Sequence, residues 1–159
     1  AYPYGNATIL PFEERYFSGG ANSVRGWSVR TLGPGRYVNT GAIDYMNQSG
    51  DIRLDSNLEA RFKLFWMFEG AAFIDAGNIW TIKDYEEQEG GYFQLNEFYK
   101  QIACSYGIGL RADFDFFVIR FDMGVNLFEP SGATSNDRWR TELSWKNDVA
   151  FHFAVGYPF

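Results

Sequence analysis

The sequence has little of several residue types, and each scarcity excludes a class of protein. Cys104 is the only cysteine, so no internal disulfide can form, and its alternating apolar neighbours favour a small buried hydrophobe over a reactive thiol. No apolar run approaches the roughly 18 residues of a membrane-spanning helix, which excludes a helical membrane protein. The chain begins Ala1-Tyr2-Pro3 without an initiating methionine or a signal sequence, so we expect a processed protein or an excised piece.

Positive charge is also scarce. The chain has 14 Lys and Arg residues against 20 Asp and Glu residues, a formal net charge of −6. A surface that binds phosphates should be basic, so nucleic acid is not an expected partner. The acidic stretch at residues 84–89 is followed by two glycines, but its spacing matches no calcium loop, and a solvated loop is the favoured interpretation. No metal or other cofactor is expected.

Aromatic residues are abundant, and they fall in a pattern with a period of two. Phe, Tyr and Trp make up 19% of the chain. In residues 51–64 one face carries Ile52, Leu54, Leu58, Ala60, Phe62 and Leu64, and the other carries Arg53, Asp55, Asn57, Glu59, Arg61 and Lys63. The same alternation returns in residues 68–80, 101–113, 117–127 and 149–159. Strands of about 10 residues with one apolar and one ionic face are typical of a transmembrane β-barrel.

The connections between these strands alternate between short and long. Tight turns are expected around residues 65–67 and 114–116, with long loops at 81–97 and 129–147, while residues 1–50 form one long loop rich in turn formers. Barrels of the outer membrane have short periplasmic turns and long extracellular loops. We therefore expect cysteines at Gln88 and Ser135 to label from outside cells, and one at Asp115 not to label.

About five strands cannot close a membrane barrel, which needs about eight, so we expect the C-terminal portion of a larger, all-β antiparallel barrel. Two unpaired sheet edges and an apolar outer face predict that the isolated chain associates with itself. The alternative is a soluble sandwich or lipocalin-like cup, which is disfavoured because five strands with ionic inner faces would bury too many charges.

Several motifs, in this order along the chain, resemble the BamA/TamA family of outer-membrane β-barrel assembly factors. They cover nearly the whole chain: residues 11–20 (PFEERYFSGG), 24–27 (VRGW), 32–35 (LGPG), 73–80 (FIDAGNIW) and 155–159 (VGYPF). Trp27 stands where the family usually has Phe or Tyr. Each motif alone is weak, but the ordered set is specific.

The resemblance implies a 16-stranded barrel in which residues 1–50 are an extracellular loop that folds into the lumen and residues 51–159 are the last five strands. Within the loop motif Val24, Arg25, Gly26 and Trp27, the arginine is expected to meet Glu59 and Asp75. The alternation independently points both acids inward. The C-terminal strand is similar to the signal by which barrel proteins are recognised for assembly, with Phe153, Val155, Gly156, Tyr157 and Phe159 as its residues. In the family this strand also forms one side of a lateral seam.

The function implied by the resemblance is insertion and folding of β-barrel proteins in the bacterial outer membrane through that seam. The expected partners are the lipid bilayer, unfolded client barrels and accessory assembly proteins. The alternative is a secretion pore of the related two-partner type. A hydrolase is disfavoured because His152, the only histidine, has no nucleophile motif near it and is expected to be a polar lumen-facing residue. No catalytic residue is expected.

Overall fold

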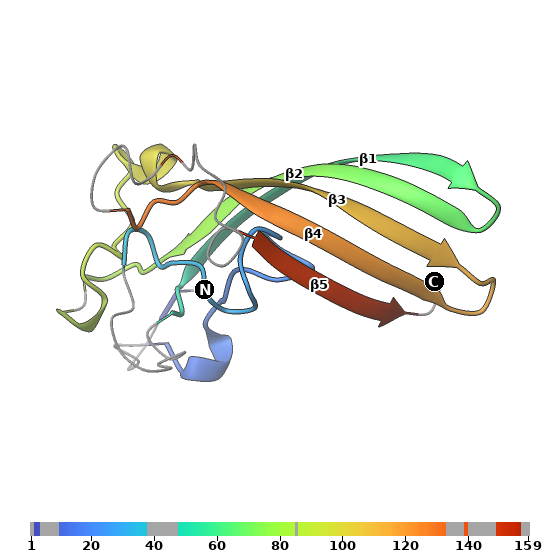
Figure 1. The fold of residues 1–159 in the computed structure, drawn as a ribbon. Coiled ribbons are helices and arrows are strands. Elements are labelled where there is room, and N and C mark those ends of the chain that lie inside the picture. The colour runs from blue at the N-terminus through green and yellow to red at the C-terminus, as the bar shows by residue number, and fades with distance from the viewer. Residues whose placement is uncertain are drawn as a thin grey trace.

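The computed structural model describes residues 2–3, 10–37, 48–84, 86–132, 139 and 149–156, and these contain one antiparallel sheet. Its strands are β1 (Ile52–Phe65), β2 (Phe68–Trp80), β3 (Ala103–Asp113), β4 (Val118–Phe128) and β5 (Val149–Gly156). Each strand pairs with its neighbour in sequence, in the order β1-β2-β3-β4-β5 (Figure 1). The predicted all-β antiparallel fold is confirmed. The sheet is open, with β1 and β5 at its edges, as expected for part of a barrel.

The two faces of the sheet differ because each strand alternates apolar and polar residues. The apolar face, called the outer face here, exposes large side chains such as Leu58, Ile108 and Phe153, which are 72%, 60% and 68% accessible. The polar face, called the inner face, carries Asp75 and Asp122, which are both fully buried. A soluble protein would bury the first set and expose the second, so this distribution fits a sheet with lipid outside and polar contacts inside.

Short and long connections lie at opposite ends of the sheet (Figure 1). Residues 66–67 join β1 to β2, and residues 114–117 join β3 to β4. In the second turn Asp115 adopts a φ of 65°, and its backbone N–H donates to Asp113 Oδ1 at 3.1 Å, as expected for aspartates that form turns. The described parts of the long connections lie at the other end, with the 3₁₀ helices Phe12–Glu14, Glu86–Gln88 and Phe98–Gln101.

None of the helices in the described ranges has the length and apolar character needed to span a bilayer.

The described part of residues 1–50 holds no strand of the sheet but packs against its inner face. Isolated bridges join Tyr16 to Gly50 and Ser18 to Leu32, which close the segment on itself. Figure 1 shows the blue segment tucked against one side of the sheet at the end with the long connections.

One labelling expectation is wrong. Gln88 is only 3% exposed, and its side-chain amide donates to the carbonyl of Ser49 at 3.0 Å. A cysteine at this position would be shielded. Ser135 lies outside the described residues, as do Tyr157 and Phe159 at the end of the predicted C-terminal signal.

Candidate functional site

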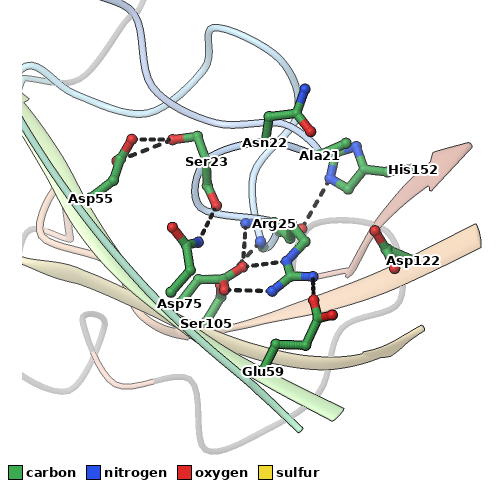
Figure 2. A network of polar contacts seen from close by, with 12 residues as sticks. Ala21, Asn22, Ser23, Arg25, Asp55, Glu59, Asp75, Ser105, Asp122 and His152 are labelled. Atoms are coloured by element: carbon green, nitrogen blue, oxygen red, sulfur yellow. Dashed lines mark hydrogen bonds and ion pairs between the residues drawn. The ribbon is translucent and has the colours of Figure 1, made fainter. Parts of the chain in front are cut away.

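The site is built around residues 18–27, called the motif loop here, which carry Arg25 onto the inner face of the sheet. The Arg25 side chain is 4% exposed although it is charged. An arginine this buried requires anionic partners. The structure brings Arg25 together with both acids named from the sequence, Glu59 and Asp75 (Figure 2). We call these three residues the Arg25 clasp.

Asp75, on β2, is the principal partner. Its carboxylate accepts hydrogen bonds from Arg25 Nε at 2.8 Å, from Arg25 NH2 at 2.9 Å and from the Arg25 backbone N–H at 3.0 Å. Two parallel bonds from one guanidinium to one carboxylate fix the orientation of both groups. Because the Arg25 backbone N–H also donates to it, Asp75 fixes the path of the loop backbone in addition to pairing with the guanidinium.

Glu59, on β1, is shared among three arginines. Its Oε2 accepts from Arg25 NH1 at 2.7 Å, while Oε1 accepts from Arg61 Nε and from Arg111 NH2, each at 2.7 Å. Burial of the Arg25 guanidinium opposes its charged form, but the hydrogen bonds and charges of Asp75 and Glu59 outweigh that effect and raise the pKa of Arg25 above its usual value. The Arg25 guanidinium therefore remains charged within the clasp.

Phe73 supports the guanidinium from below. This aromatic residue lies on the inner face of β2 and is 2% exposed, and the Arg25 Cζ atom lies 3.5 Å from its ring centroid. A guanidinium stacked on an aromatic face gains a cation–π interaction that is stronger when the pair is desolvated.

The backbone of the motif loop is also held by side chains of the sheet (Figure 2). From the first and third strands, Asn57 Nδ2 donates to the Ser23 carbonyl at 2.8 Å, and Ser105 Oγ accepts from the Gly26 N–H at 3.1 Å. From the last two strands, Arg120 NH2 donates to the Ala21 carbonyl at 3.0 Å, and His152 Nε2 lies 3.0 Å from the Arg25 carbonyl oxygen. All five strands thus contact one loop.

Glycine at position 26 is required by this close packing. A Cβ there would overlap the side chains of Ser105 and Asn126. On the opposite side of the contact, a Cβ at Gly124 would overlap the Arg25 carbonyl and crowd the Gly26 nitrogen. The loop backbone therefore lies directly on β3 and β4.

The two apolar residues of the motif have a packing role. Val24 is fully buried, Trp27 is 7% exposed, and both belong to a small hydrophobic cluster with Leu32 and Ala103. The Trp27 carbonyl also accepts from the Gly20 N–H at 2.9 Å, which closes the base of the loop. Trp27 therefore keeps the loop compact without contacting the acids of the clasp.

The predicted C-terminal signal lies away from the loop. Phe153 and Val155 are on the outer face of β5 and are 68% and 60% exposed, and Gly156 ends the strand in open space. These residues are placed to face lipid or another strand.

Sequence reasoning missed several residues of the site: Asn57, Phe73, Ser105, Arg120 and the contact made by His152. The alternation assigned His152 to the inner face, but it could not identify a backbone carbonyl as its partner. No group of three His, Cys, Asp or Glu side chains in the described residues is placed to hold a metal ion.

The comparisons with known proteins agree with the geometry. The family model for the Omp85 superfamily domain matches residues 1–159. The chain belongs to the Omp85 superfamily. It is 30% identical over 89 residues, 53% of this chain, to the outer membrane protein assembly factor BamA of Neisseria meningitidis serogroup B. The matched part is 11% of that protein, so the chain spans a small fraction of this Omp85 relative. As a BamA/TamA-type member of the superfamily, the protein resides in the bacterial outer membrane.

Proposed function

We propose that the protein carrying this chain handles other proteins at the outer membrane, and that it inserts and folds β-barrel clients there. Membership in the Omp85 superfamily supports the general role in insertion or secretion. Similarity to a protein named as an assembly factor favours insertion over secretion. The proposed partners are the bilayer, unfolded barrel clients and accessory assembly proteins. The activity needs no covalent chemistry, and we do not expect the protein to be an enzyme.

The observation that carries this proposal is the position of β5. This strand pairs with β4 on one side, and within the described sheet its other edge has no partner. An unpaired edge can accept an incoming strand by backbone hydrogen bonding. The outer side chains of β5, including Phe151 and Phe153, are exposed and apolar, so a strand added here would enter lipid directly. We propose that, in the intact barrel with its strands outside this chain, this edge of β5 is the side of the seam at which a client strand is added.

The anchored motif loop provides the second part of the mechanism. The Arg25 side chain connects the loop to β1 and β2, and its carbonyl oxygen lies against His152 on β5, so the loop covers the inner face as far as the open edge. We propose that this holds the barrel wall in shape while the edge opens. Removing the clasp should then impair insertion without preventing the sheet from forming.

The test is a charge reversal in the intact protein as its gene encodes it. Arg25→Glu places a third carboxylate beside Glu59 and Asp75, and we expect a strong defect in growth and in the amount of folded client barrels in the outer membrane. Adding Asp75→Arg to the same molecule restores opposite charges and should recover part of the activity. Insertion of a client barrel into vesicles containing the purified variant gives the direct measurement.

Arg30→Glu is the matched control, because Arg30 is an exposed arginine that closely follows the motif loop and stacks on Phe17 instead of an acid. It should insert clients at the normal rate. Normal client insertion by Arg25→Glu would contradict the proposal. Loss of export of one secreted protein with normal client insertion would favour the two-partner secretion pore.

A further inference from the structure

His152 makes a contact that the clasp does not explain. The residue lies on β5, faces the inner side and is 9% exposed. Its Nε2 lies 3.0 Å from the Arg25 carbonyl oxygen (Figure 2). A carbonyl oxygen can only accept a hydrogen bond, so Nε2 must carry the hydrogen, which fixes the tautomer of the neutral ring. The bond is available in both the neutral and the protonated form of the imidazole.

The contacts of the motif loop reach from one side of the sheet to the other. On β1 and β2, Glu59 and Asp75 hold the Arg25 side chain. On β4 and β5, Arg120 and His152 hold the loop backbone through the carbonyls of Ala21 and Arg25. The two edge strands do not pair with each other in the described sheet, yet both contact one residue, Arg25.

We infer that His152 is a positioning residue that ties the last strand to the motif loop, so that the loop, which Glu59 and Asp75 hold on β1 and β2, braces β5 from the inner face. Within the described residues β5 pairs with β4 at 8 register positions, whereas β1 pairs with β2 at 13, so the described ladder that holds β5 is the shorter one. The bond from His152 supplies an additional, buried attachment. A shift of β5 therefore requires movement of the loop.

Only the functional consequence of this inference rests on the proposed function. That consequence is that movement of β5 at the seam is coupled to the motif loop. The brace itself can be measured without any client. Two buried positions serve as reporters in the intact protein: Val24 in the motif loop, which is fully buried, and Ala150 on the inner side of β5, which is 8% exposed. Each is replaced singly by cysteine in a Cys104→Ala background, and its rate of reaction with a maleimide is followed in membranes.

His152→Leu removes the donor and retains bulk, whereas His152→Gln retains an N–H donor. Loss of one buried hydrogen bond should accelerate labelling at both reporters by roughly 5- to 30-fold in His152→Leu. His152→Gln should return both rates to within about threefold of the parent, since the donor is restored. Retention of fast mobility in unheated detergent gels shows that each variant is folded.

Unchanged labelling in a folded His152→Leu variant would overturn the inference. Equal acceleration in His152→Leu and His152→Gln would also overturn it, because packing and not the hydrogen bond would then be responsible. Acceleration at Val24 alone would show that the loop is tethered but that β5 is not braced, which again overturns it. Failure of the proposed function is detected separately, by the client-insertion assay on Arg25→Glu.

Discussion

Two long segments cover the same end of the sheet, and they are held by different combinations of contacts. The motif loop is fixed by directed polar contacts, with Arg25 at their centre. The connection between β2 and β3, residues 81–102, adds aromatic packing, in which the rings of Trp80, Phe93 and Phe98 lie 5.6 to 6.4 Å apart, to neutral hydrogen bonds such as that from Trp80 Nε1 to Gln101 Oε1 at 2.7 Å. Aromatic packing tolerates small shifts, whereas bidentate hydrogen bonds do not. The first segment can therefore act as a defined attachment, and the second as a cover.

The largest expected effect comes from removing Asp75, the principal acceptor for Arg25. Asp75→Ala leaves the buried guanidinium and the Arg25 N–H without their main acceptor. Breaking a buried ion pair from one side destabilises by about 3–5 kcal/mol. We expect labelling of a cysteine at position 24 to rise by at least about a hundredfold. Labelling unchanged from the parent would mean that the loop is held by packing, like the β2–β3 connection.

A smaller but still clear effect is expected from Gly26→Ala. The added methyl group overlaps Ser105 and Asn126, so the loop must move away from β3 and β4. Overpacking of this kind destabilises by about 1–3 kcal/mol. The same cysteine reporter measures it, and Gly156→Ala, where nothing lies within 4 Å, is the matched control. Equal labelling in the two variants would show that the close approach is not maintained in the membrane.

Phe98→Ala tests the other side of the comparison. The ring contacts those of Trp80 and Phe93, and each such pair contributes about 0.5–1.5 kcal/mol beyond simple burial. We expect faster proteolysis within residues 81–102 and no change at the position-24 reporter. If the reporter also responds, the two segments are one cooperative unit and the distinction between them fails.

The smallest structural disturbance is expected from single cysteines at two exposed positions, which test which end of the sheet faces the outside of the cell. Asn96 is exposed in the β2–β3 connection, and Asp115 is exposed in the opposite turn. A cysteine at position 96 should react with an impermeant maleimide on intact cells, and one at position 115 should react only after the outer membrane is opened. The reverse pattern would invert the orientation of the sheet.

The strands could be predicted from the sequence because a period of two directly records which side chains face lipid. The short turns were equally readable, since Asp113 and Asp115 leave few alternatives between two alternating segments. Two arguments predicted the contacts of Arg25. The family resemblance named Glu59 and Asp75 as its partners, and the alternation placed both acids on the inner face. The structure adds that the two acids are not equivalent, because Asp75 also accepts a hydrogen bond from the Arg25 backbone N–H.

The remaining contacts could not be predicted, for physical reasons. The partners of Asn57, Arg120 and His152 are backbone carbonyls, and every residue has one, so no side-chain pattern reveals them. Ser105 lies beside a register shift in the pairing of β3 with β4, which a regular alternation does not locate. Phe73 shares the inner face with Asp75, two residues further along β2, but its contact with Arg25 depends on how the motif loop packs on the sheet.

Because Arg25 is packed on Phe73, the Arg25–Asp75 ion pair should be insensitive to the salt concentration around the protein. Dissolved ions weaken an exposed ion pair such as Arg53 with Asp55, whose arginine side chain is 34% accessible, but they screen a desolvated pair much less. With the aromatic ring beneath it and the loop above, the Arg25–Asp75 pair has side-chain exposures of 5% and 0%. The ion pair that attaches the motif loop to the sheet should therefore keep its strength from low to high salt. This suits a protein of the outer membrane, where the ionic strength follows that of the environment.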